Sequence, residues 1–197
     1  MLNLATVVET NARLYPDKPA LITEQSRVTH GALNAFANQV ANSLLELGVR
    51  PGDRVALSCL TNPFFTMCYY GILKTGAVVV SLNPLLKREE IARNLDDAEV
   101  SVFICHDGAG QLPMAVEGYA AFEMACGCRS FCLIQEDGEQ PCLPNRAVDF
   151  SALVKPQSRA FETVQTAPPP TPTASVTLTV TGWNVLGLVT EIWPDMT

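Results

Sequence analysis

Positive charge is scarce in this sequence, and nowhere do Lys and Arg gather into a cluster. The 197 residues include 13 Lys and Arg against 20 Asp and Glu, which gives a formal net charge of −7. Surfaces that bind nucleic acid or anionic membranes need clustered positive charge, so we expect no nucleic-acid partner. Charged residues make up 17% of the chain and hydrophobic residues 48%, a balance typical of a packed core rather than of general disorder.

Long apolar runs are also missing. The longest strongly apolar stretch, residues 77–82, is far too short to cross a bilayer. The opening residues carry no basic segment, and Glu9 interrupts their apolar run, so we expect no signal peptide. We therefore predict a cytoplasmic protein without a transmembrane segment, in which any contact with a membrane is peripheral.

Common catalytic and phosphate-binding signatures are absent. The sequence contains neither the Gly-x-Ser-x-Gly elbow of hydrolases nor the His-Glu-x-x-His motif of metalloproteases. The turns that follow two apolar runs are Thr61-Asn62-Pro63 and Asn83-Pro84, and they lack the glycines that let backbone amides approach a phosphate. We therefore predict no dinucleotide site at these turns.

The remaining chemistry-bearing side chains stand apart, and each has an ordinary structural explanation. Adjacent carboxylates on a helix do not face each other, an isolated lysine seldom forms an anion site, and a lone histidine is usually solvated or hydrogen-bonded. We therefore assign no catalytic residue, no cofactor-binding residue and no metal ligand. The side chains concerned are His30, His106, the pair Asp96 and Asp97, Lys74 and Lys87.

Cysteine is present, but its spacing is not that of a disulfide or zinc framework. Only Cys126 and Cys128 are closely spaced, and one intervening residue is the wrong separation for the usual zinc knuckle. Cys132 lies near this pair, so a metal site stays open as the less favoured alternative. We expect reduced thiols in a cytosolic protein; the cysteines are Cys59, Cys68, Cys105, Cys126, Cys128, Cys132 and Cys142.

What the sequence does contain is a regular alternation of apolar runs and helical patterns. Uninterrupted apolar runs at 55–60, 77–82 and 100–105 are typical of strands buried on both faces of a parallel sheet. Helical segments at 64–73 and 86–95 separate them, which indicates two crossover units. The helix at 64–73 lacks a polar face, so we expect it to lie between two layers. We predict an α/β fold with a mostly parallel sheet and flanking helices.

Weaker patterns extend the alternation in both directions. Apolar positions at helical spacing, and short apolar runs between turn signals, predict further helices and strands on each side of this core. The helices are expected at 3–14, 33–47, 115–124 and 150–154, and the strands at 20–23, 27–29 and 130–135.

The composition changes abruptly at about residue 163. Residues 163–190 contain no charged side chain, are rich in threonine and include the proline run 168–172. Within this stretch residues 176–181 alternate valine or leucine with threonine, the period of a half-exposed strand. We therefore predict a first domain at 1–162 and an atypical Pro/Thr-rich tail at 163–197 with one strand.

Four stretches in order resemble the opening subdomain of the adenylate-forming superfamily, which includes acyl-CoA synthetases, peptide-synthetase adenylation domains and luciferases. The resemblance is strong over residues 3–107 and thinner to Ala167. The run at 82–87 is most similar to that of bacterial fatty acid–CoA ligases. The four stretches are residues 16–21, 47–55, 71–84 and 95–97.

The resemblance implies an activity for a parent enzyme and a missing part in this chain. Such a ligase converts a fatty acid and ATP into an acyl-adenylate with loss of pyrophosphate, and CoA then displaces AMP to form a thioester. Mg²⁺ offsets the phosphate charge. The family places a Ser/Thr- and Gly-rich loop ending in Pro-Lys-Gly after the strand that we predict at 176–181. Here Thr181-Gly182 is followed by Trp183 and Asn184, without the further glycines or the lysine. We expect an inactive fragment that binds no cofactor itself, produced by truncation or a change of reading frame.

Two alternatives accompany this interpretation. The chain could be a genuine non-catalytic α/β module for binding or interaction, in which case it should be a stable monomer. A small flavodoxin-like protein is less favoured, because phosphate-binding loops are absent. A separated ligase subdomain should instead expose apolar surface and self-associate.

Overall fold

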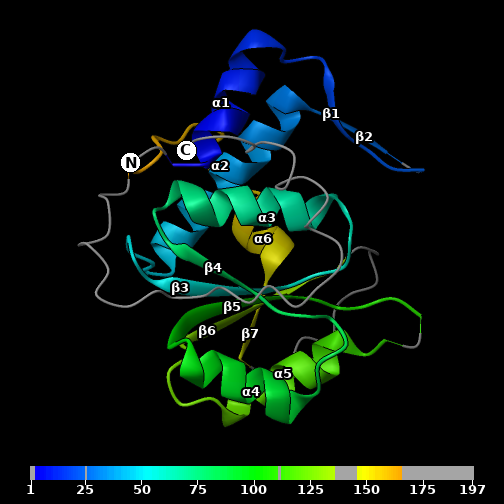
Figure 1. Ribbon diagram of the computed structural model, residues 1–197, viewed down its shortest axis with the longest axis vertical. Coiled ribbons are helices and arrows are strands. Elements are labelled where there is room, and N and C mark those ends of the chain that lie inside the picture. Colours follow the sequence, from blue (N-terminus) through cyan, green and yellow to red (C-terminus); the bar gives the residue numbers. More distant parts are fainter. Residues whose placement is uncertain (1–2, 25, 111, 136–145, 166–197) are drawn as a thin grey trace, which may run out of the picture. The chain divides into compact units, whose positions relative to one another are not determined.

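The structure, a computed structural model, describes residues 3–24, 26–110, 112–135 and 146–165. All of them belong to one compact unit, residues 1–167, and Figure 1 shows its helices and strands. In chain order they are α1 (Ala5–Leu14), β1 (Pro19–Ile22), β2 (Arg27–Thr29), α2 (His30–Glu46), β3 (Arg54–Ser58), α3 (Pro63–Lys74), β4 (Val78–Ser81), α4 (Arg88–Asp97), β5 (Val100–His106), α5 (Met114–Met124), β6 (Ser130–Ile134), β7 (Ala147–Asp149) and α6 (Phe150–Val154).

A five-stranded sheet in the order β4-β3-β5-β6-β7 forms the centre of this unit. All four strand pairs in it are parallel. The chain moves from β3 outward to β4 and then returns past β3 to β5, so the direction of strand addition reverses between β3 and β5. The predicted α/β fold with a mostly parallel sheet is confirmed, and β1 with β2 forms a separate antiparallel pair.

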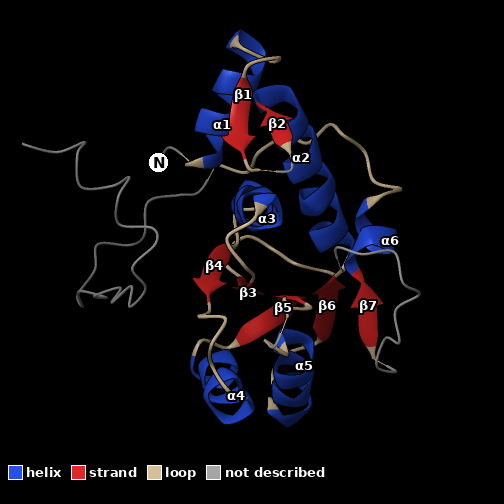
Figure 2. Cartoon of the chain, turned by 90° about the vertical axis from the view of Figure 1, so that its right-hand side faces the viewer, coloured by secondary structure: helices blue, strands red, loops and turns tan. Residues whose placement is uncertain are grey.

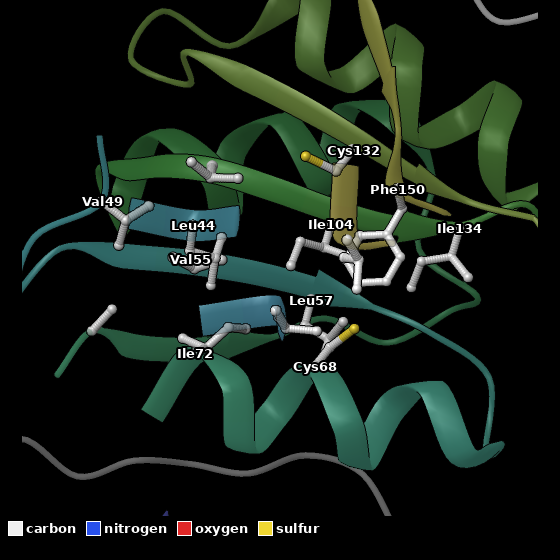
Figure 3. Packing of buried hydrophobic residues seen from close by; sticks show 14 of the residues in the cluster. Leu44, Val49, Val55, Leu57, Cys68, Ile72, Ile104, Cys132, Ile134 and Phe150 are labelled. Atoms are coloured by element: carbon white, nitrogen blue, oxygen red, sulfur yellow. The ribbon is translucent and has the colours of Figure 1, made fainter. Parts of the chain in front are cut away.

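Helices cover both faces of the sheet, as Figure 2 shows. Helices α4 and α5 pack on one face, against side chains such as Phe103 and Phe131. Helices α2, α3 and α6 pack on the other face, where Val55 and Ile104 lie at the centre of a second cluster; Figure 3 shows these side chains from close by. Alternate residues of each central strand face opposite sides of the sheet, so most positions in β3, β5 and β6 are buried.

Helix α3 lies between two apolar layers, as its lack of a polar face predicts. Cys68 and Ile72 pack toward the sheet, whereas Met67 and Tyr70 belong to a smaller cluster with residues of α1, α2 and the β1–β2 pair. At Gly71 the helix approaches α2 so closely that an added Cβ would lie 2.6 Å from Val40 Cβ.

The structure also differs from the sequence predictions. β4 was expected to be buried on both faces, but it is the edge strand, and Val78 is 50% exposed. An apolar run indicates that its side chains favour burial, but it does not indicate which strands will lie next to it in the sheet. β7 was not predicted at all, because three half-buried residues give too short a pattern. The predicted strand at 176–181 lies outside the described residues.

Candidate functional site

The carboxyl ends of β3 and β5 are where an open parallel sheet most often binds a ligand, because the strand order reverses between them. Cys59 and Asn62 follow β3, and His106 ends β5 with Asp107 directly after it. The structure therefore brings together residues that are 44 positions apart in the sequence, as the contact between Asn62 and His106 shows.

His106 is completely buried and lies between these two strand ends. Its Nε2 is 3.1 Å from Asn62 Nδ2, and its Nδ1 is 3.0 Å from Asp107 Oδ1. Asn62 Oδ1 already accepts the Phe65 amide at 3.3 Å as the N-cap of α3, so its NH₂ group faces the histidine. The Gly108 amide also donates a hydrogen bond to Nδ1, at 3.0 Å.

This arrangement joins two strand ends but offers little to a substrate. A ring that is wholly buried cannot exchange a proton with a bound molecule unless the site opens. Asn62 adds the capping bond that begins α3. The side chains of Asn62, His106 and Asp107 therefore tie the ends of β3 and β5 together; that His106 has no catalytic role stays a prediction.

The hollow at this edge of the described structure is small and is lined in part by a carboxylate. The enclosed space between Ser58, Lys87 and Glu117 measures about 10 Å³, which is room for roughly one water molecule. The Glu117 carboxylate also occupies the start of α4, where it accepts the Arg88 amide at 3.1 Å. An anion would meet this carboxylate before it met the helix N-terminus.

A second hollow lies beside the first turns of α2 and is wide and open, with a volume of about 530 Å³. Glu9 and Glu162 line it together with Phe161, Thr163, Asn34 and Gln165. Two carboxylates make this surface unfavourable for ATP or another polyanion.

The remaining side chains that we singled out do not come together. Lys74 is completely buried and paired with Glu9, whereas Lys87 is exposed at the start of α4. His30 begins α2, where its amide donates to the Lys18 carbonyl at 3.0 Å. The two lysines flank β4 but form no common anion site.

The acidic pair and the thiols have structural explanations. Asp96 accepts the Cys126 amide at 2.9 Å and so ties the loop before β6 to α4. Burial raises the pKa of Cys128 to about 11 and the pKa of Cys132 to about 12, so both thiols stay protonated and are poor metal ligands near neutral pH. Within the described ranges no three metal-binding side chains converge, and Cys142 lies outside them.

The family-like stretches correspond to turns with definite geometric demands. Gly76 joins α3 to β4 with φ +79°, and an added Cβ would lie 3.0 Å from Val164 and 3.1 Å from Pro51. Asn83 accepts the Leu85 amide at 2.9 Å and shapes the loop that leads to α4. These residues determine the path of the chain and contact no open site.

Comparisons with known proteins agree with this architecture. A family model described as AMP-binding enzyme matches residues 8–181. The crotonobetaine/carnitine–CoA ligase of Salmonella typhimurium is 37% identical over 107 residues, which are 52% of this chain and 21% of that protein. No helix in the part of the chain that the structure describes is long and apolar enough to span a bilayer.

Solved structures show the same likeness. An anthranilate CoA ligase in complex with anthranoyl-AMP has a TM-score of 0.70 and 31% identity, over 83% of this chain and 30% of that one. A benzoate CoA ligase from Burkholderia xenovorans has a TM-score of 0.69 and 24% identity, over 85% of this chain and 31% of that one, and at this identity the likeness is one of fold. The chain thus spans about a fifth of the curated relatives it matches.

Proposed function

Because this chain belongs to the AMP-binding enzyme family, we propose that it is the N-terminal subdomain of an ATP-dependent ligase that joins a carboxylic acid to coenzyme A. In that reaction the carboxylate attacks ATP to give an acyl-adenylate and pyrophosphate. The thiol of CoA then displaces AMP and forms a thioester. ATP, Mg²⁺ and CoA are the cofactors and partners of such a ligase, and we propose the cytoplasm as its location.

The observation that carries this proposal is the family match over residues 8–181. The 71–84 stretch supports it, because there the turn at Gly76 and the loop at Asn83 have the geometry that the local sequence demands. The contribution that we propose for residues 3–165 is architectural. They supply a sheet whose carboxyl edge is closed by Asn62 and His106, and the reacting groups come from elsewhere.

We propose a fatty acid as the substrate, on the similarity of residues 82–87 to fatty acid–CoA ligases. Leu85, the apolar tip of this run, is 69% exposed, so it is not part of an acyl pocket within the described residues. The relatives named above act on carnitine-type and aromatic acids, and these are the competing substrate classes.

The experiment that tests the proposal begins with the gene, read in all three frames from the codon for Ala160 onward. We expect a frame that encodes a glycine-rich loop ending in Pro-Lys-Gly. Protein in which residues 1–160 continue into that frame is then assayed for AMP release from ATP with CoA and, in turn, a long-chain fatty acid, carnitine and benzoate. Release with the fatty acid alone supports the full proposal, and release with another acid corrects the substrate. A frame with the loop whose protein releases no AMP with any acid overturns the proposed activity, and absence of such a frame favours the non-catalytic module.

A non-catalytic α/β module is the second candidate function. The observation that favours it is the sequence at 181–184, where Trp183 and Asn184 stand in place of the small residues that a phosphate loop requires. Light scattering on the 197-residue chain separates the two candidates. A stable monomer favours the module, and concentration-dependent association favours a separated ligase subdomain.

A further inference from the structure

Residues 155–165, which we call the strap, run along α2 and end against α1 and α3. Within the strap only Thr163 is buried, with 8% of its surface exposed. The strap therefore removes little apolar area from water, in contrast to the central strands of the sheet. A segment with few buried apolar contacts and many bonds near solvent is typical of the parts of a protein that open locally.

The middle of the strap is held by amide side chains on α2. Asn38, Gln39 and Asn42 donate to its backbone carbonyl oxygens, at distances between 2.7 and 3.2 Å. Because the acceptors are main-chain atoms, this row of amides can hold the strap's backbone whatever side chains the strap carries. The acceptors are the carbonyl oxygens of Gln157, Ser158, Arg159 and Ala160.

The far end of the strap is fixed by a charged cluster. Lys74 has a fully buried side chain and forms an ion pair with Glu9, whose side chain is 33% exposed. Thr163 Oγ1 accepts a hydrogen bond from Lys74 Nζ at 3.3 Å and donates one to the Glu9 carboxylate. The Val164 amide completes the attachment by donating to the Lys74 carbonyl at 2.9 Å.

Burial has opposite consequences for the two charges of this cluster. It lowers the pKa of Lys74, and the hydrogen bond and charge of Glu9 offset this only in part. Burial by itself raises the pKa of Glu9, but the bonds from Lys74 and Thr163 outweigh it and the pKa is lowered. The fully buried ammonium of Lys74 therefore carries a desolvation cost.

Opening of the strap would relieve the desolvation of the Lys74 ammonium. Once Thr163 leaves, water reaches Lys74 Nζ and Glu9, and hydration replaces the hydrogen bonds that are lost. The amides of α2 and the freed carbonyls of the strap are solvated in the same way. Because neither large apolar cluster includes residues 155–165, the sheet loses none of its core.

We propose that the strap is a conformational device that the Lys74–Glu9–Thr163 cluster holds closed and that opens while the five-stranded sheet stays folded. Its opening frees the backbone of residues 157–164 and uncovers the amide row on α2. This inference does not depend on the ligase function, because it concerns only the described residues and their own contacts.

Amide hydrogen exchange on the 197-residue chain tests the proposal, with the Val164 amide reporting on the strap and the Ile104 amide reporting on β5. In the unsubstituted chain Val164 should be protected but should exchange at least about tenfold faster than Ile104. Thr163→Val keeps the shape and removes the hydroxyl, so exchange at Val164 should rise by about tenfold while Ile104 changes by less than about twofold. Thr163→Ser keeps the hydroxyl and should leave both rates nearly unchanged.

Glu9→Gln supplies a second perturbation from outside the strap. It leaves a buried ammonium without its counter-charge and should speed exchange at Val164 by more than Thr163→Val does, again without a change at Ile104. Equal exchange rates at the two amides in the unsubstituted chain would show that the strap and the sheet open together. A parallel rise of both rates in Thr163→Val or Glu9→Gln would show the same. Loss of the sheet's circular dichroism signal in Thr163→Val would show the same coupling and overturn the proposal. An unprotected Val164 amide would refute the closed strap.

Discussion

The contact between α2 and α3 at Gly71 makes a sharp prediction for the substitution Gly71→Ala. A Cβ at this position would lie 2.6 Å from both Cβ and Cγ1 of Val40 and 3.0 Å from the Ala37 carbonyl oxygen. An approach as short as 2.6 Å falls in the upper part of the range for overpacking and costs about 2–3 kcal/mol, whereas replacing glycine by alanine inside a helix gains about 1 kcal/mol. We therefore expect the free energy of unfolding to fall by about 1–2 kcal/mol.

Urea unfolding followed by circular dichroism measures this change. Gly127→Ala is the matched control, because no heavy atom lies within 4 Å of the added carbon, and it should change stability by less than about 0.5 kcal/mol. In the background of Val40→Gly the obstructing carbon is gone, so Gly71→Ala should become stabilising by up to about 1 kcal/mol. A neutral or stabilising Gly71→Ala in the unsubstituted chain, with no change of sign in the second background, would refute the close contact.

Three further predictions concern the sheet edge, the acidic range and catalysis. Asn62→Ala removes the α3 cap and the contact to His106, so thermal unfolding should reveal a loss of about 1–2 kcal/mol, while Asn62→Asp should keep most of the capping energy. The hydrogen bond from Arg88 lowers the pKa of Glu117 below its ordinary 4.5. The stabilisation from this pair is therefore present above pH 4.5 and is lost as the pH falls through the lowered pKa. Glu117→Gln should flatten the dependence of the free energy of unfolding on pH between about pH 2 and 5. The 197-residue chain should release no AMP from ATP with CoA and any of the three acids, and release above background would show that the phosphate loop is dispensable.

The central strands were predictable because each carries its own signal. Most residues of β3, β5 and β6 are apolar and buried, and a parallel sheet with helices on both faces is the fold that accepts such runs. β4 has the same kind of sequence, yet Val78 is half-exposed at the edge. The order of strands depends on packing between elements, and no periodicity within one run contains it.

The candidate sites were harder to predict, because their partners are distant in the sequence. Lys74 looked like one of two surface lysines beside a strand, but Thr163, which is 89 residues away, helps to enclose it. In the sequence, Asn62 stands out only as part of a turn that lacks glycine. Its contact with His106 forms only because β3 and β5 are neighbours in the sheet. The change of composition at residue 163 suggested a boundary there, and the ordered contacts continue through Val164; the boundary itself stays a prediction.

The motifs that identify this family and the groups that perform its chemistry answer to different physical demands. Gly76 is required by a backbone with positive φ and by the approach of Val164 and Pro51, and this demand is independent of any substrate. A phosphate cradle instead needs successive amides free of bulky side chains and a nearby cation. After Gly182, the bulky Trp183 and the amide Asn184 stand where small residues are needed, and neither of them is a cation. Similarity to the family up to this point is therefore compatible with an absence of catalysis. Substrate preference has to be sought in residues that build the pocket rather than the sheet.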